Sequence, residues 1–520
     1  MKHIILKILL FFSILFIIFL DACTEKDIEL YPTQENDLIY YKQEKNVENI
    51  LWMTYNFLWV RTGPWGNSHR AWGNFPSDDA YTGGSDDSDQ QTYQDADKYK
   101  VSPLDPADNL KTQWQTNFQG IYACNLLISN VPNDKDFNRQ AIAEAKFLKA
   151  FYYFELVRIF GGLPLLDKPM SPVDQVKRST YDETLQYIAD ILNDAINMKK
   201  LNGTSPALQV RTSQSGPTNG RATLASAQAL LGKIYLYQKK YKEAISILLE
   251  IDKNNNYALE TNYSDIFKVG NKLGKESIFE INYSKDNGLG SLAIGNGEIQ
   301  LFGPRPVSLT EFNSDIIAGW GFDQPSQNLV DAYKSQNDIL RLNTTVVSCD
   351  SLQKIYNAYK KSDQPPITWQ NSKDGYWDGK SIPRNSNRGT GWGYDQTNTI
   401  VIRLADVYLM LAEAYNRTGN DGEARNYLNK VRKRVGLPDV TSSGDALFEA
   451  IKLERRLELA LEGERYFDLL RWGDAEKVLG PLGYKDGTPG VKTNGLFPIP
   501  QSEINRTTGE YVLEQNPGYN

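Results

Sequence analysis

The sequence predicts a mainly α-helical fold: a scaffold of tetratricopeptide-like helical repeats with a large irregular, loop-rich region. Three observations predict it. Two segments share one spacing of small and large residues, residues 136–160 are apolar on nearly every helical face, and residues 275–400 mostly lack helical periodicity. The shared spacing indicates paired helices, the apolar segment indicates a central helix, and the aperiodic stretch indicates a functional loop region.

The repeat spacing occurs twice along the chain. The matching sets are Gly232, Tyr235, Ala244 and Leu248 within residues 221–251, and Ala412, Tyr415, Ala424 and Leu428 further on. Small residues at these positions let two antiparallel helices approach each other, and the larger residues fill the space between them. Because isolated helix pairs cannot bury their faces, we expect further pairs and assign them to residues 38–60, 110–160 and 181–199.

Glycine and proline mark the end of the predicted central helix. Gly161 and Gly162 can supply positive φ, and Pro164 prevents the helix from continuing. Small and polar residues dominate 61–109 and 201–220, so both segments are predicted to be loops. Within the aperiodic stretch, the run SIFEIN that begins at residue 277 predicts a strand.

The first residues have the features of an export signal. Lys2 and Lys7 precede an apolar run over residues 8–20. As a helix this run would rise about 20 Å, which is short of the roughly 30 Å needed to span a bilayer. We therefore expect residues 1–22 to be a signal peptide.

A cysteine follows this signal directly. The segment LDAC over residues 20–23 resembles a bacterial lipobox, except that Asp21 is charged where a small residue is usual. We expect Cys23 to be lipidated and residues 23–36 to form a lipid-anchored tether. The alternative is an ordinary cleaved signal with an incidental cysteine.

Composition argues against several functions. The net charge is -7, whereas proteins that bind nucleic acid need clustered Lys and Arg. An acidic chain is compatible with a neutral ligand such as a sugar. Beyond the signal the chain has one histidine, His69, so we expect neither a histidine-based catalytic triad nor a multi-histidine metal site. Cys124 and Cys349 allow at most one disulfide, which the sequence leaves open, although the apolar surroundings of Cys124 are typical of a buried thiol.

Several stretches resemble, in order, the segments that characterise the SusD/RagB family of outer-membrane nutrient-binding lipoproteins. They are residues 143–164 (AEAKFLKAFYYFELVRIFGGLP), 403–416 (RLADVYLMLAEAYN), 429–438 (NKVRKRVGLP), 454–472 (ERRLELALEGERYFDLLRW), 497–500 (FPIP) and 515–519 (QNPGY). The resemblance implies an N-terminal helical region over 37–274, a loop-rich ligand- and partner-facing region over 275–400, and a C-terminal helical region over 401–520. Residues 37–520 are expected to behave as one compact unit.

The resemblance also implies a function. A protein of this family is expected to be lipid-anchored on the outer membrane and exposed on the cell surface of a Bacteroidetes bacterium. It would capture oligosaccharide and deliver it to a SusC-type TonB-dependent transporter, for which it acts as a lid. No catalysis, cofactor or nucleic-acid partner is implied. The alternatives are a surface scaffold or peptide-binding subunit of the same transporter class, and a divergent carbohydrate hydrolase.

Three glutamates recur every four residues near the C-terminal end, at Glu454, Glu458 and Glu462. Paired carboxylates can serve a glycosidase when they stand roughly 5 to 9 Å apart across a sugar. Here the glutamates are predicted to share one continuous helix with interleaved arginines, which favours a lattice of ion pairs between helices.

Sugar binding needs flat apolar rings against pyranose faces and polar groups for hydroxyls, and two loop stretches supply both. The ligand-binding candidates are Trp72, Asn74, Asp78, Asp79, Tyr81 and Tyr93 in the first stretch, with Trp65 nearby, and Arg305 and Trp320 in the second. A structural role is an equal alternative for Trp320. Trp369, Trp377 and Trp392 are further candidates that the sequence does not rank.

The first stretch is also rich in aspartate. The acidic residues are Asp78, Asp79, Asp86, Asp87, Asp89, Asp95 and Asp97. Oxygen-rich loops can bind calcium, but no EF-hand spacing is present. We therefore predict no metal site, and keep calcium as an alternative to a solvated loop or to acceptors for sugar hydroxyls.

Overall fold

The structure is a computed structural model of the 520-residue chain, and it describes residues 40–60, 68–105, 108–170, 175–214, 220–284, 295–306, 318–359, 372–387, 395–483 and 493–519. The predicted signal peptide, Cys23 and the tether lie outside the described residues. Trp65, Trp369 and Trp392 do so as well.

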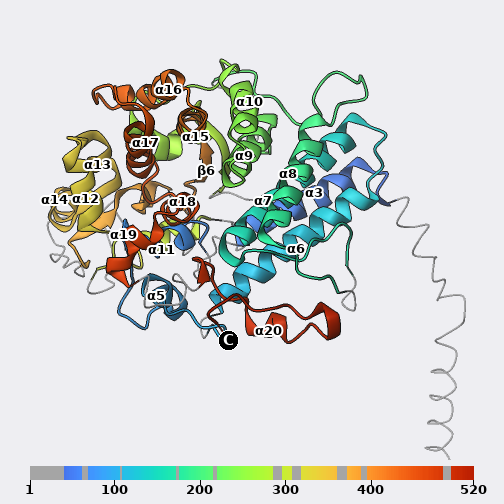
Figure 1. Ribbon diagram of the computed structural model, residues 1–520, viewed down its shortest axis with the longest axis horizontal. Helices are drawn as coiled ribbons and strands as arrows, with labels where there is room; N and C mark the ends of the chain where they lie inside the picture. Colours follow the sequence, from blue (N-terminus) through green and yellow to red (C-terminus); the bar gives the residue numbers. More distant parts are fainter. Residues whose placement is uncertain are drawn as a thin grey trace, which may run out of the picture.

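Helices arranged in antiparallel pairs form the larger part of the fold (Figure 1). They are α3 (Glu44–Val60), α6 (Asn109–Asn130), α7 (Asp136–Phe160), α8 (Tyr181–Asn197), α9 (Leu224–Tyr237), α10 (Tyr241–Asp252), α15 (Leu404–Arg417), α16 (Asp421–Arg434) and α17 (Gly444–Glu458). From α6 to α10 each helix packs on the next, α10 packs on α15, and α15 packs on both α16 and α17. The mainly α, tetratricopeptide-like fold class is thus confirmed.

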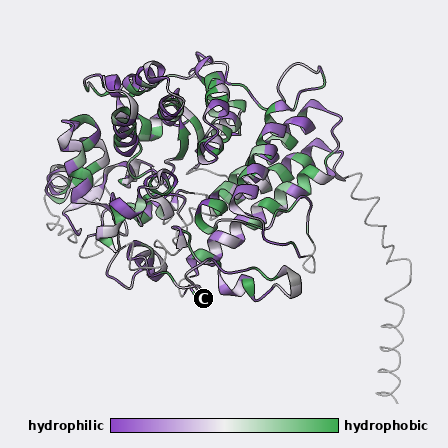
Figure 2. Cartoon of the chain, viewed as in Figure 1, coloured by the Kyte–Doolittle hydropathy of each residue, from purple (hydrophilic) through white to green (hydrophobic). Residues whose placement is uncertain are grey.

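The predicted small residues lie where the paired helices meet. A Cβ added at Gly232 in α9 would stand 2.3 Å from the Cδ2 atom of Leu248 in α10, so any larger residue would force the Leu248 side chain to move. In the second pair Ala412, Ala424 and Leu428 are fully buried. Along these helices the chain alternates between hydrophobic and hydrophilic residues (Figure 2), as expected for helices with one buried side.

Helix α7 is central, as its all-round apolar character predicts. From Phe147 to Phe160 all its residues are buried. The helix ends at Gly161, whose φ of 77° lies in the region that favours glycine. Among the described residues no helix is both long and apolar enough to cross a membrane.

Within the part of the chain that the structure describes, three two-stranded antiparallel ribbons connect distant segments. The predicted strand is present as β2 (Ser277–Ile281), which pairs with β6 (Thr399–Arg403). The other two ribbons are β1 (Ala80–Gly83) with β3 (Phe322–Pro325), and β4 (Val346–Ser348) with β5 (Tyr376–Asp378).

The predicted loop regions contain more regular structure than the sequence indicates. The additional helices are α4 (Ala71–Asn74), α5 (Gln91–Asp97), α11 (Gly297–Phe302), α12 (Gln327–Ser335), α13 (Ile339–Thr345) and α14 (Cys349–Tyr359). The C-terminal region adds α18 (Arg465–Trp472), α19 (Ala475–Leu479) and α20 (Gln501–Ile504). Most of these helices are too short to produce a clear periodicity, and local contacts define them. The Ser326 hydroxyl, for example, caps α12 by accepting a hydrogen bond from the Leu329 N–H at 3.2 Å.

Buried ion pairs join the helical array to the loop-rich region, as predicted from the spaced glutamates. Arg341 of α13 approaches Glu454 at 2.7 Å and Glu458 at 2.8 Å, and Arg403 pairs with Glu458 and, at 2.9 Å, with Glu462. The prediction of one continuous helix is wrong, because α17 ends at Glu458 and the following turn contains Leu461 with φ 61°. Glu462 therefore approaches Arg403 from this turn.

Both described cysteines are free thiols, so no disulfide joins them. Cys124 is fully buried in the main hydrophobic core, and Cys349 lies 3.2 Å from the indole nitrogen of Trp377. Trp377, one of the unranked sugar-binding candidates, is fully buried.

Candidate ligand-binding site

The ribbon of β1 and β3 brings together the two sequence stretches predicted to bind a ligand. Tyr81 pairs with Gln324, and the Gly84 N–H donates to the Gly321 carbonyl at 2.9 Å. Gly83 and Gly321 have φ values of 74° and 80°, and a Cβ at Gly83 would lie 2.3 Å from the Gly321 oxygen. Glycine is therefore required where the two stretches meet.

Trp72 and Tyr93 belong to the core beneath this ribbon, which corrects their predicted role. Trp72 is 1% exposed, and its ring packs edge-on against Tyr93 and Phe497 at centroid distances of 5.4 and 5.0 Å. Tyr93 is fully buried, and its hydroxyl accepts a hydrogen bond from the Ser68 N–H at 3.1 Å. Neither ring offers a free face to a sugar. Tyr93 also supports β1, because its backbone carbonyl accepts a hydrogen bond from the Thr82 hydroxyl at 2.9 Å.

Asn74 is also structural and not a ligand-facing amide. Its side-chain nitrogen donates to the Asp323 carboxylate at 2.9 Å, and its side-chain oxygen accepts from the Gly463 N–H at 2.9 Å. The residue is 1% exposed. One amide thus ties α4 to β3 and to the turn after α17, and the predicted contact with a sugar is corrected.

Asp78 and Asp79 anchor the same segment through ion pairs. Arg465 approaches Asp78 at 2.8 Å, and Arg456 approaches Asp78 at 3.0 Å and Asp79 at 2.7 Å. Burial alone would raise the pKa of Asp78, but the guanidinium groups of Arg465 and Arg456 outweigh it and lower that pKa. The carboxylates are occupied by arginine, so their prediction as free acceptors for sugar hydroxyls is corrected.

Tyr81 is the candidate of the first stretch whose ring lines a groove. The ring is half-buried, and the Nζ atom of Lys373 lies 3.9 Å from its centroid. Burial, together with the nearby Asp374 carboxylate, raises the pKa of Tyr81 to about 12, so the hydroxyl stays protonated at neutral pH. The residue presents an apolar ring with a hydrogen-bonding hydroxyl, which suits a sugar.

The groove beside Tyr81 has a volume of about 580 Å³, within the range of roughly 300–1,000 Å³ usual for ligand sites. It is lined by Ser77, Asp78, Ala80, Tyr81, Asp97, Lys98, Lys100, Ser326, Asn328, Lys373, Val478, Pro481, Leu482 and Gly483. These residues come from β1, α5, the start of α12, the turn before β5, and α19. The groove combines one aromatic ring and an apolar wall with amide, hydroxyl, ammonium and carboxylate groups.

Arg305 and Trp320 lie at the glycine end of the ribbon and do not line the groove. The Arg305 guanidinium donates to the Trp320 carbonyl at 3.3 Å and lies 3.5 Å from Asp89. The Trp320 ring is half-buried and packs on the main core. The ribbon thus connects both predicted stretches. Tyr81 lines the groove, whereas Arg305 and Trp320 lie outside it.

Sequence reasoning missed most of the groove. Asp97 was noted only as one of many loop aspartates, and Lys100, Asn328 and Lys373 were not considered. Lys373 has no periodic or compositional signal, because its position over Tyr81 depends on the turn that leads into β5. The exposed Leu482 at the groove edge follows α19 and has no sequence signal either.

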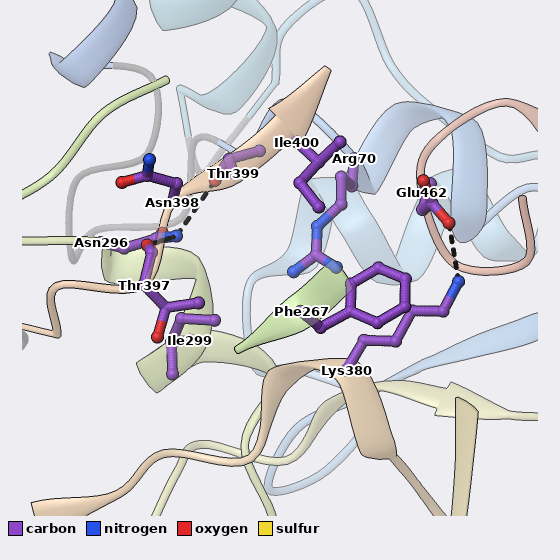
Figure 3. Close-up of a pocket in the computed structure, with 10 residues that line it drawn as sticks. All are labelled: Arg70, Phe267, Asn296, Ile299, Lys380, Thr397, Asn398, Thr399, Ile400 and Glu462. Atoms are coloured by element: carbon purple, nitrogen blue, oxygen red, sulfur yellow. Dashed lines mark hydrogen bonds and ion pairs between the residues drawn. The ribbon is translucent and has the colours of Figure 1, made fainter. Parts of the chain in front are cut away.

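Two other cavities are less suited to a sugar. The first, shown in Figure 3, has a volume of about 30 Å³, which holds only one or two water molecules. Arg70 points into it beside the Phe267 ring, while Lys380 pairs with Glu462 at 2.8 Å. The second has a volume of about 470 Å³, and none of its described lining residues is a predicted ligand residue.

The aspartate-rich loop forms local hydrogen bonds. Asp86 accepts from the Ser88 N–H at 2.8 Å, and Asp89 accepts from the Ser85 N–H at 2.9 Å. Within the described ranges, no group of three acidic, histidine or cysteine side chains is placed to hold a metal ion. Calcium binding stays the alternative to the predicted absence of a metal site, and nothing in the structure tests either.

Paired helices that support a loop-built groove define a class of helical-repeat binding proteins. Residues 33–236 match a family model described as "Starch-binding associating with outer membrane", and residues 343–519 match one described as "SusD family". A solved structure named "Laminarin binding SusD-like protein" is 32% identical with a TM-score of 0.76, and the alignment covers 91% of this chain and 99% of that one. The chain belongs to the SusD family.

Two further relatives are less similar in sequence. Surface glycan-binding protein A from Bacteroides thetaiotaomicron, solved in complex with laminarihexaose, is 25% identical with a TM-score of 0.76 over 91% of this chain and 99% of its own. SusD-like protein P25 of Formosa agariphila is 26% identical over 75% of this chain and 76% of its own.

Proposed function

We propose that this protein is a cell-surface glycan-binding protein that holds an oligosaccharide in the groove beside Tyr81. The observation that carries the proposal is this ring on the wall of a groove of about 580 Å³, surrounded by polar side chains. Two relatives of similar fold are named for binding laminarin or glycan. An aromatic ring can cover the apolar face of a pyranose while the polar groups take its hydroxyls.

The proposal includes a place on the cell. Cys23 would carry lipid after removal of residues 1–22 and would anchor the protein to the outer membrane. The protein would then deliver its oligosaccharide to a SusC-type TonB-dependent transporter and act as its lid. Family membership and the lipobox-like segment support this part. Labelling with a radioactive fatty acid, lost in a Cys23→Ala variant, tests the anchor, and recovery of a barrel protein with the detergent-extracted complex tests the partnership.

We further propose that the protein binds its glycan without cleaving it. Glu454 and Glu458 are the residues whose spacing most resembles a pair of glycosidase carboxylates. Both form ion pairs with Arg341. Both are fully or almost fully buried. Carboxylates held in this way are not free to donate a proton to a glycosidic oxygen.

A binding experiment with product analysis tests the proposal. Purified protein is titrated with neutral and acidic oligosaccharides and with peptides, and the bound material is recovered and sized. We expect an oligosaccharide to be retained at its original length. Retention of peptide alone would support the peptide-uptake alternative, and recovery of shortened sugar would support a hydrolase.

A further inference from the structure

Two lysines of the groove form no ion pair with any residue that the structure describes. Lys100 and Lys373 are exposed, line the groove, and make no ion pair with any described residue. Lys373 instead places its ammonium over the Tyr81 ring. The groove therefore presents two exposed ammonium groups, one of them over an aromatic ring.

Two acidic residues, Asp78 and Asp97, line the groove, against the three lysines Lys98, Lys100 and Lys373. Asp78 is paired with Arg465 and Arg456 at 2.8 and 3.0 Å. Asp97 is half-buried and accepts a hydrogen bond from the Thr82 N–H at 3.1 Å, and burial raises the pKa of Asp97 to about 6.

Of the two further charged side chains in or beside the groove, Lys98 forms an ion pair and Asp374 forms a hydrogen bond to a backbone N–H. Lys98 has its own partner, Asp87, at 2.9 Å. Asp374, next to Lys373, accepts from the Gln327 N–H at 2.7 Å. Lys100 and Lys373, which form no ion pair with a described residue, are the cations that a ligand would meet, with Asp97 and Asp374 as nearby anions.

We propose that the groove binds an acidic oligosaccharide, one whose sugar units carry carboxylate or sulfate groups. The sugar ring lies against Tyr81, and its anionic substituents reach Lys373 and Lys100. This inference rests on the proposed glycan-binding function and narrows it to one substrate class. Carboxylate and sulfate share the chemistry that the lysines recognise, and the experiment distinguishes them.

The charge of the two lysines leads us to expect two measurable effects on ligand affinity. Exposed pairs contribute modestly and are screened by salt, so loss of one lysine should weaken an acidic ligand about threefold and loss of both about tenfold. A neutral oligosaccharide of the same length should be affected by neither change.

The test compares three probes by titration calorimetry: an oligogalacturonate, a sulfated carrageenan oligosaccharide, and laminarihexaose as the neutral probe. Affinities are measured at about 50 and 300 mM salt for the intact protein and for a Lys100→Gln, Lys373→Gln double variant. The control variant is Lys253→Gln, Lys334→Gln, which removes two exposed lysines, one directly after α10 and one in α12, outside the groove lining. A Lys373→Arg variant keeps the charge and should retain affinity.

We expect at least one acidic probe to bind more tightly than laminarihexaose, to weaken with salt, and to lose about tenfold in affinity in the groove variant alone. The preferred acidic probe identifies carboxylate or sulfate. Binding of laminarihexaose with equal or higher affinity, unaffected by the groove variant, would overturn the acidic assignment and leave glycan binding intact. Failure of every oligosaccharide to bind would contradict the proposed function itself.

Discussion

The Nζ atom of Lys373 lies 3.9 Å from the centroid of the Tyr81 ring. This contact joins the turn before β5 to strand β1, and it places a cation and an aromatic ring on the same groove. A sugar that enters the groove would meet both groups together.

Replacement of Tyr81 tests the contribution of the ring. We expect Tyr81→Ala to weaken glycan binding about tenfold, because an aromatic contact is worth roughly 1 kcal/mol. Tyr81→Phe keeps the ring and should bind within about threefold of the parent protein. Titration calorimetry measures both, with thermal unfolding as a control for folding. Unchanged affinity in Tyr81→Ala would remove this residue from the site.

Replacement of Trp72 tests its assignment to the core. We expect Trp72→Ala to lower the free energy of unfolding by about 3–5 kcal/mol, since it leaves a cavity among Tyr93 and Phe497. Trp52 is 44% exposed on α3, so Trp52→Ala should cost less than about 1 kcal/mol. Urea unfolding compares the two. A Trp72→Ala protein of unchanged stability and weakened glycan binding would favour a direct ligand contact instead.

Replacement of Glu458 tests the buried ion-pair lattice. Burial alone would raise the pKa of Glu458, but Arg434, Arg403 and Arg341 outweigh it and hold the pKa well below its usual range. Glu458→Gln should therefore cost about 3–5 kcal/mol of unfolding free energy.

The lattice also predicts a pH dependence and has a natural control. Because the folded-state pKa of Glu458 is depressed, its stabilisation is present above about pH 4.3 and is lost as the pH falls below it. Glu449, which is exposed beside Lys452, is the control, and Glu449→Gln should cost less than about 1 kcal/mol. If Glu458→Gln and Glu449→Gln had equal free energies of unfolding in urea, the ion-pair lattice would not contribute to stability.

Asp97 provides a pH prediction of opposite sign. Its pKa is raised to about 6 by burial, against the Thr82 N–H hydrogen bond and the nearby positive charges of Lys373 and Lys98, with Asp87 also raising it. The folded protein therefore prefers the neutral acid, and its ionisation costs stability as the pH rises from about 4 to about 6.

The variant that tests this is Asp97→Asn, which stays neutral and can still accept from Thr82. Its free energy of unfolding should exceed that of the parent protein by about 1–2 kcal/mol at pH 7.5, and the two should be equal near pH 3.5. Urea unfolding across this range measures the difference. A constant difference at every pH would show that ionisation of Asp97 is not its cause.

The helical half of the fold was predictable because long amphipathic helices repeat their pattern many times. Gly232 and Leu248, for example, appear at positions whose spacing matches a second pair, and they meet between α9 and α10. Short elements such as α12 were not predictable in the same way, since one serine cap and a few side chains define them.

The candidate site was harder to predict because aromatic residues in a loop do not reveal which of them are buried. Trp72 and Tyr81 lie in the same stretch, yet Trp72 is covered by Phe497 from near the C-terminus, while Tyr81 lines the groove. Asn74 likewise looked like a sugar-binding amide until its partners Asp323 and Gly463 were known. Contacts between distant segments decide these roles, and a single sequence does not contain them explicitly.

A crystal structure of the protein with the oligosaccharide that it binds most tightly tests the central claim most directly. The account predicts a sugar ring within about 4 Å of the Tyr81 ring, with its substituents directed toward Lys373 and Lys100. A sugar bound elsewhere on the protein, with this groove empty, would contradict the account.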